Sequence, residues 1–186
     1  MLSLPLQIRA QQVFNAGGLI AYPTEAVYGV GCDPFNPDAV MHLLALKQRD
    51  WRKGLIVLVD SFNALSRLIE PLGGAQWERL HDSWPGPITY LIPANTSVPH
   101  WVRGTSDKIA VRYSAHPIAQ ALCHAVGGVL ISTSLNIAGE PPVRSALHAQ
   151  KQWGNAVDLI IPGATGGQKN PTQIKDLMTD ECIRPS

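Results

Sequence analysis

The feature that most constrains the fold is a set of short, continuously apolar runs that alternate with segments of helical spacing. Residues 55–59 read LIVLV, and residues 19–22 and 129–132 are similar runs bounded by glycine, proline or hydroxyl residues. Runs of this kind are typical of strands covered on both faces. Strands that alternate with helices predict an α/β fold, because each helix can then cover one face of the sheet.

Local spacing and turn residues predict the other elements. Closely spaced segments between residues 84 and 113 predict that part of the sheet is antiparallel. We therefore expect a single domain over residues 1–186, with a mixed parallel and antiparallel sheet flanked by helices. The expected helices are 4–16, a helix that begins at 36–38, 61–69, 75–83, 117–126 and 145–153. The expected strands are 19–22, 27–32, 55–59, 88–92, 109–113, 129–132 and 159–161, with short strands near 172–176 and 181–184.

The composition favours a globular chain with little overall charge. Hydrophobic residues make up 45% and charged residues 16% of the 186 positions, which excludes a disordered class. The net charge of +1 provides no overall field to recruit nucleic acid. Three scattered cysteines favour reduced thiols and a cytoplasmic location. No apolar stretch approaches the roughly 20 residues of a membrane helix, so we expect no membrane association.

A polar segment follows the first buried strand. Residues 22–31 read YPTEAVYGVG, and polar groups just past a strand are the usual ligand position in α/β sheets. The alternative is a plain connection between two strands. The spacing does not match a dinucleotide fingerprint, because Pro34 stands where the third glycine would be.

A basic segment precedes the apolar run at 55–59. It contains Lys47, Arg49, Arg52 and Lys53, four cations in seven residues. Such a cluster can neutralise a polyphosphate, which arginine binds through two parallel hydrogen bonds and lysine binds as a point charge. The alternative is a solvated helix end, because cations are favoured there in any case. From the residues alone both interpretations stand.

Two further features could hold an anionic ligand. Ser132, Ser134 and Asn136 cluster where a strand ends and could hold ribose or phosphate oxygens, although such residues also form turns and caps. Arg112 lies inside an otherwise apolar strand, so its charge requires either an anionic ligand or a buried carboxylate. There is no Walker-type phosphate loop, no GxSxG elbow and no zinc-type Cys/His spacing. The residues thus predict an α/β domain with one anion site built from loops.

At these positions the chain resembles the YrdC/TsaC family of threonylcarbamoyl-AMP synthases. The matching motifs occur in the family's order from about residue 18 to residue 184. They are Pro23-Thr24-Glu25, Tyr28-Gly29, Lys47-x-Arg49, Lys53-Gly54-Leu55, Trp84-Pro85-Gly86-Pro87, Ala110-Val111-Arg112, Ser132-Thr133-Ser134-x-Asn136, Gly139 and Asn170-Pro171-Thr172.

The resemblance implies a twisted sheet with a concave, positively lined cavity. It also implies a reaction in which ATP, bicarbonate and L-threonine give threonylcarbamoyl-AMP and pyrophosphate. Partner proteins would then transfer the threonylcarbamoyl group to adenosine 37 of tRNAs that read codons beginning with A. Catalysis would consist of positioning and charge neutralisation, because the carbamate nucleophile is already anionic. Mg²⁺ would arrive with ATP, and no resident metal is expected.

The resemblance also implies roles for individual residues. The expected catalytic residues are Lys47 and Arg49. The residues expected to bind ATP are Lys47, Arg49, Lys53, Ser132, Ser134, Asn136 and Arg144, with Arg184 a further candidate. The residues expected to bind threonine are Thr24, Tyr28, Arg112 and Thr172.

Three positions depart from the family pattern, and one alternative function stays open. Asp50 stands where many relatives have proline, Leu135 where they have alanine, and Ala115 where they have aspartate. Asp50 brings a negative charge beside the expected phosphate site. The alternative function is a module that binds double-stranded RNA or tRNA, which the net charge of +1 disfavours. A sensor that binds ATP without turnover is a third possibility.

Overall fold

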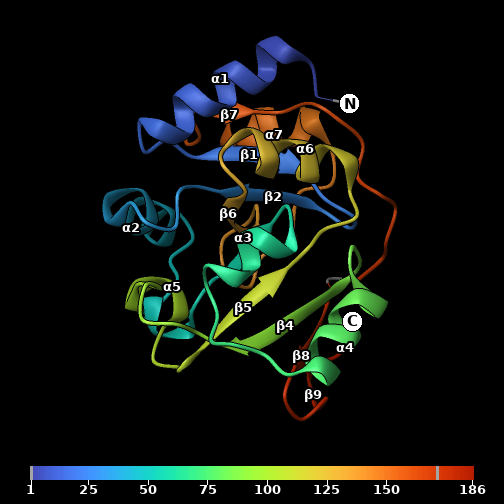
Figure 1. Ribbon diagram of the computed structural model, residues 1–186. Coiled ribbons are helices and arrows are strands. Elements are labelled where there is room, and N and C mark those ends of the chain that lie inside the picture. Colours follow the sequence, from blue (N-terminus) through green and yellow to red (C-terminus); the bar gives the residue numbers. More distant parts are fainter. Residues whose placement is uncertain (1, 171) are drawn as a thin grey trace.

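The computed structural model describes residues 2–170 and 172–186 and is built around a nine-stranded sheet (Figure 1). The strands lie side by side in the order β7-β1-β2-β6-β3-β5-β4-β8-β9. Their bounds are β1 Ile20–Pro23, β2 Tyr28–Gly31, β3 Ile56–Val59, β4 Ile88–Pro93, β5 Lys108–Arg112, β6 Val129–Ser134, β7 Leu159–Ile160, β8 Gln173–Asp176 and β9 Cys182–Arg184.

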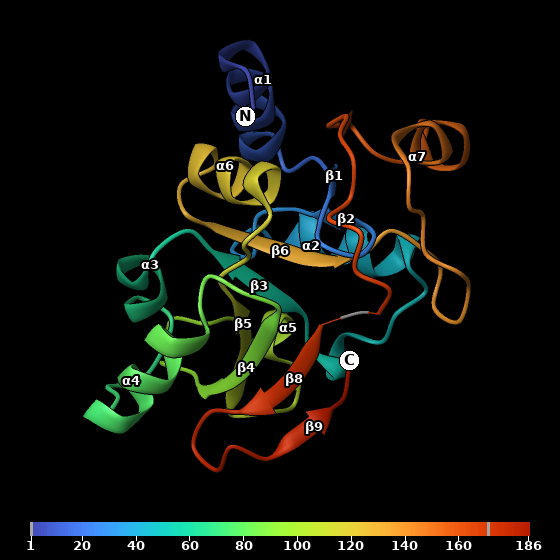
Figure 2. The same cartoon turned by 90° about the vertical axis from the view of Figure 1, so that its right-hand side faces the viewer.

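The sheet is mixed, as the sequence predicts. Its parallel pairs are β1 with β7, β3 with β5 and β4 with β8. The remaining neighbours are antiparallel, including β4 with β5 in the region of short loops. β7 and β9 are the two edge strands of the sheet. Figure 2 agrees with this order, because it shows β9 and α7 (Ala146–Trp153), the helix directly before β7, at opposite ends of the molecule.

The other helices are α1 Leu4–Asn15, α2 Pro37–Leu46, α3 Phe62–Ser66, α4 Gly74–Ser83, α5 His100–Arg103 and α6 Pro117–Ala125, with a 3-10 helix η1 at Trp51–Lys53. α2 begins as predicted, because the Asn36 side chain accepts a hydrogen bond from the Ala39 amide and Pro37 takes the first helical position. The sequence does not predict α5 and η1, which span four and three residues and are too short for a periodic signal.

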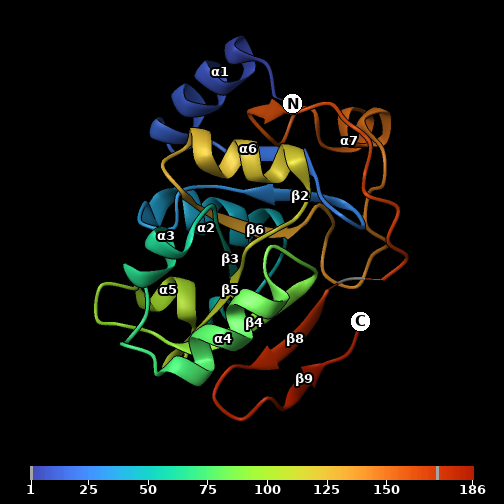
Figure 3. The same ribbon diagram turned by 45° about the vertical axis from the view of Figure 1, so that its right-hand side comes forward.

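Apolar side chains fill both faces of the sheet. α1 and α6 pack on one face against Ile20, Tyr22 and Leu130, and Figure 3 shows these two helices on the same side of β2. A second cluster, which includes Leu43 of α2 and Val57 of β3, forms the rest of the core. Within the described ranges, no helix has both the length and the apolar character needed to cross a membrane.

Candidate functional site

A cavity of about 310 Å³ lies at the carboxyl end of β6, where β2, β3 and β5 also contribute. Three guanidinium groups from distant parts of the chain line it, together with hydroxyl and amide side chains. We call it the arginine cavity. Its lining residues are Thr24, Ala26, Val27, Gly29, Arg49, Leu55, Ile56, Leu58, Arg112, Ser132, Thr133, Ser134, Asn136, Pro142, Thr172 and Arg184.

The end of α2 sends two successive cations in different directions. The Arg49 amide bonds to the Leu44 carbonyl and the Gln48 amide to the Ala45 carbonyl, which is the double closure of a Schellman motif. Gln48 takes the left-handed residue of this motif, with φ of 50°. The chain therefore reverses between Lys47 and Arg49, which places Lys47 in the interior and Arg49 in the cavity wall.

Lys47 lies beneath the arginine cavity and not in its wall. Its side chain is 4% exposed, and its ammonium donates to the carbonyl oxygens of Ser134 and Asn136, the latter at 2.8 Å. Burial, with a smaller contribution from Arg49, lowers the pKa of Lys47 to about 8. Lys47 therefore holds the loop after β6 in place and adds positive charge just below the lining residues.

Arg49 and Arg184 bring like charges together from opposite ends of the chain. Burial first, and then the charge of Arg184, lower the pKa of Arg49, and burial also lowers that of Arg184. The Arg49 Nη2 atom donates to the Gly54 carbonyl at 3.0 Å, while its buried Nε atom has no partner among the described residues. Arg184 donates to the Thr172 carbonyl at 2.8 Å. Two guanidinium groups whose charges repel each other favour an anion between them.

Arg112 is paired with a buried carboxylate, that of Glu25, which is one of the two alternatives that the sequence left open. Its Nη2 atom forms an ion pair with Oε2 of Glu25, and its Nε donates to the Gly86 carbonyl at 3.3 Å. Glu25 Oε1 in turn accepts from the Ser114 hydroxyl and from the amides of Ala115 and His116. Arg112 still reaches the cavity wall.

The pKa of Glu25 reflects this environment. Burial is the largest influence and raises the pKa, but Arg112 and the hydrogen bond from Ser114 together outweigh it. The net result is a pKa below the ordinary value for glutamate, so the carboxylate stays charged beside Arg112.

Neutral polar groups complete the wall. Ser132, Ser134 and Asn136 come from β6 and the loop after it, as the sequence predicts. The Asn136 amide nitrogen donates to the Glu140 carbonyl, while its buried Oδ1 has no partner within the described part of the chain. Thr24 donates its hydroxyl to the Val27 carbonyl, and the Thr172 hydroxyl lies 3.4 Å from that of Thr89. Pro171, the residue before Thr172 in the matching motif, lies outside the described residues.

Three further expected residues lie outside the wall, in addition to Lys47. Tyr28 is fully buried, and its hydroxyl donates to the Gly163 carbonyl at 2.7 Å, because β2 turns this side chain into the core. Lys53 is exposed at the end of η1. Arg144 is exposed, and its guanidinium donates to the carbonyls of Gln168 and Lys169. It therefore stabilises the Gly-rich loop 163–170. Their expected ligand contacts therefore stay predictions.

The three departures from the family pattern have local structural roles. The Asp50 carboxylate caps η1 by accepting from the Arg52 amide, and it pairs with the Arg52 side chain at 3.6 Å. Leu135 is fully buried in the core. Ala115 is exposed and contributes its backbone amide to Glu25. None of the three lines the arginine cavity.

The arrangement is suited to anions. Three guanidinium groups, with Lys47 beneath them, face hydroxyl and amide groups that can fix a ligand without adding charge. Among the residues that the structure describes, no three His, Cys, Asp or Glu side chains gather into a metal site. Glu25 is the main residue that sequence reasoning missed. The signal available was a lone carboxylate in an otherwise uncharged segment, 87 positions from Arg112.

Comparison with known proteins identifies the family. Residues 12–186 match the sequence model of the Sua5/YciO/YrdC family, which is described as a telomere recombination family. The chain belongs to the Sua5/YciO/YrdC family. Curated relatives in this family include the threonylcarbamoyl-AMP synthases of Pseudomonas aeruginosa strain UCBPP-PA14 and of Cellvibrio japonicus, which are 49% and 44% identical over 177 residues. Each match covers 95% of this chain and about the same share of the relative, 95% and 94%.

Solved structures of the Sua5/YciO/YrdC family share the fold. P. abyssi Sua5 complexed with L-threonine matches with a TM-score of 0.88 and 30% identity over 96% of this chain. The chain spans only about half of that longer protein, 53% of its length. E. coli YciO matches with a TM-score of 0.86 and 25% identity, covering 98% of this chain and 90% of YciO. The expected fold class, a mixed sheet flanked by helices, is confirmed.

Proposed function

We propose that this protein is a threonylcarbamoyl-AMP synthase, which converts ATP, bicarbonate and L-threonine into threonylcarbamoyl-AMP and pyrophosphate. The observation that carries the proposal is the convergence of Arg49, Arg112 and Arg184 on one cavity with Ser134 and Asn136. It occurs in a chain that aligns over nearly its whole length with relatives of that name.

The phosphates of ATP occupy the side of the cavity formed by Arg49 and Arg184. Burial and repulsion from Arg184 both lower the pKa of Arg49, since both disfavour its charged form. An anion bound between the two guanidinium groups offsets these unfavourable effects. Ser134 and Asn136 Oδ1, which has no partner among the described residues, then bind the nucleotide. Lys47 acts from below, by fixing the carbonyls of Ser134 and Asn136 and by its positive charge. Mg²⁺ enters as part of the ATP substrate.

L-Threonine occupies the side formed by Arg112, Thr24 and Thr172. The Arg112 guanidinium, which is held in the cavity wall by its ion pair with Glu25, receives the threonine carboxylate. The hydroxyls of Thr24 and Thr172 lie in the same wall and can meet the polar groups of the amino acid.

The reaction follows from bringing the two ligands together. The amine of threonine and bicarbonate give a carbamate with loss of water. A carbamate oxygen then forms a bond to the α-phosphorus of ATP, and the bond from that phosphorus to the pyrophosphate oxygen breaks. The nucleophile is already anionic, so positioning and neutralisation of the developing phosphate charge supply the catalysis.

The protein then acts early in tRNA modification. A threonylcarbamoyl adenylate is a reactive mixed anhydride, so tRNA-modifying transfer proteins would consume it. We propose that the chain works as one YrdC-like domain in the cytoplasm, where its free thiols Cys32, Cys123 and Cys182 would stay reduced. Direct RNA binding is the alternative. It would weaken steeply with salt, whereas turnover of small substrates would respond less.

Substrate omission tests the proposal. Pyrophosphate release should require ATP, bicarbonate and L-threonine together, with threonylcarbamoyl-AMP detected by mass spectrometry. Arg49→Ala should abolish release while the circular dichroism spectrum stays unchanged. Arg52→Ala is the matched control, because Arg52 is exposed and paired with Asp50 outside the cavity. Release that continues without threonine or bicarbonate would contradict the proposed reaction.

A further inference from the structure

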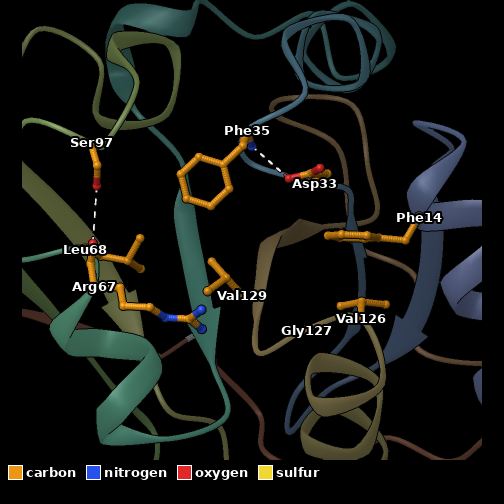
Figure 4. Close-up of a pocket in the computed structure, with 9 residues that line it drawn as sticks. All are labelled: Phe14, Asp33, Phe35, Arg67, Leu68, Ser97, Val126, Gly127 and Val129. Carbon is orange, nitrogen blue, oxygen red and sulfur yellow. Dashed lines mark hydrogen bonds between the residues drawn. The ribbon is translucent and has the colours of Figure 1, made fainter.

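A second cavity, of about 470 Å³, shares no lining residue with the arginine cavity. Figure 4 shows it between α3 on one side and α1 and α6 on the other. We call it the Phe35 pocket. Its lining residues are Phe14, Asp33, Phe35, Arg67, Leu68, Ser97, Val126, Gly127 and Val129. Val129 is the first residue of β6, whereas the arginine cavity uses the last residues of that strand.

The floor of the Phe35 pocket is apolar and belongs to the core. Phe14, Leu68 and Val129 are each less than 9% exposed, so they form a fixed surface at the base of the opening. Gly127 has φ of 97°, and nothing lies within 4 Å of the place where a side chain would project from it. The α6–β6 turn therefore leaves the opening clear. A volume of this size is typical of sites for small organic molecules.

Phe35 is an aromatic ring held out into this opening. Its side chain is 48% exposed, although burial of such a ring is favourable. Its backbone is fixed, because the Phe35 amide donates to Asp33 Oδ1 at 2.8 Å and the Trp101 indole donates to the Pro34 carbonyl at 3.1 Å. Figure 4 shows the ring directed toward the pocket. The backbone that carries the exposed ring is thus fixed at the edge of the pocket.

Arg67 supplies the charge that decides the ligand class. Its carbonyl is fixed by Asn95 and Ser97, while its guanidinium has no hydrogen bond or ion pair with any described residue. Figure 4 shows the guanidinium extended over the floor toward Val129. Asp33, the other charged lining residue, lies on the far side of Phe35 and is engaged with the Phe35 amide. A cation beside an apolar floor is complementary to an acid with an apolar body.

We propose that the Phe35 pocket is a binding site for a small organic anion with an apolar, ring-sized body. The body lies on Leu68 and Val129 against the Phe35 ring, and the acidic group pairs with the Arg67 guanidinium. The site is separate from the arginine cavity, so binding there does not depend on the proposed synthase reaction.

A pair of fluorescent probes tests this proposal on the full chain. 8-Anilinonaphthalene-1-sulfonate carries an aromatic body and an anionic group, and N-phenyl-1-naphthylamine has the same body without the charge. Arg67→Gln should weaken the sulfonate probe about tenfold or more, since a charge-assisted bond is lost, and should leave the neutral probe unchanged. Phe35→Ala should weaken both probes. Arg9→Gln and Leu147→Ala are the matched controls, because both residues are exposed elsewhere.

The titrations are run with and without saturating ATP, and amide NMR shifts locate the bound probe. The proposal expects shifts at Gly127 and Val129 and a probe affinity that ATP does not change. It is overturned if Arg67→Gln and Phe35→Ala bind the sulfonate probe as tightly as the controls, or if ATP displaces the probe completely. It is also overturned if Arg67→Gln weakens both probes equally, because the charge would then play no part.

Discussion

Glu25→Gln should destabilise the protein far more than the loss of an ordinary surface ion pair. The Glu25 side chain and its partner Arg112 are 9% and 10% exposed. Glutamine can keep an oxygen in the place of Oε1 for the Ser114, Ala115 and His116 donors, but it leaves the Arg112 charge buried without a counter-charge. Removal of one partner from a buried pair costs about 3–5 kcal/mol.

Urea unfolding measured by circular dichroism provides the assay. Asp180→Asn is the matched control, because Asp180 is 47% exposed and pairs with Lys175 at 3.1 Å. An exposed pair of this kind contributes up to about 1 kcal/mol. The two substitutions remove the same charge, so a large difference in unfolding free energy isolates the effect of burial.

The pH dependence gives a second test of the same prediction. The pKa of Glu25 is lower in the folded protein than its ordinary value of 4.5. The unfolded chain therefore takes up the proton first as pH falls, and the stability from this group is present above about pH 4.5. The difference between wild type and Glu25→Gln should shrink as pH falls through the lowered folded pKa. The reasoning is refuted if Glu25→Gln costs no more than Asp180→Asn near neutral pH, or if the difference grows in acid.

Three further predictions concern the arginine cavity. Lys47→Ala should abolish pyrophosphate release. It should also loosen the loop after β6, which would be measured as faster amide exchange at Leu135. Unchanged exchange would contradict the structural role of Lys47. Arg112→Ala should raise the KM for threonine at least tenfold and that for ATP much less, and equal effects would contradict a carboxylate contact. Because the pKa of Lys47 is about 8, its charge is lost above that pH, so the KM for ATP should rise there. A KM that stays flat to pH 9.5 would count against this contribution.

The sequence was sufficient for most of the elements, although not for α5 and η1, because their signals are local. The apolar run at 55–59 and the Asn36-Pro37 cap each report on neighbouring residues, and β3 and α2 appear where they predict. The strand order was not predictable in this way, because it places β6 between β2 and β3 and β8 beside β4. Such pairings depend on contacts between residues far apart in the chain.

The site shows the same division. The polar character of residues 132–136 and the basic segment at 47–54 were evident from the sequence, and Ser134 and Arg49 do meet in one cavity. The direction of each side chain was not evident. Lys47 and Arg49 are two positions apart, but the left-handed turn at Gln48 separates them, and the placement of Tyr28 depends on which face of β2 is buried. The ion pair between Glu25 and Arg112 depends on the approach of segments that are distant in sequence.

A crystal structure with a non-hydrolysable ATP analogue and L-threonine tests the central claim most directly, because that claim is that one cavity holds both substrates. The prediction places the phosphates against Arg49 and Arg184, the nucleotide beside Ser134 and Asn136, and the threonine carboxylate against Arg112. Phosphates bound away from Arg49, or threonine bound outside the arginine cavity, would contradict the account.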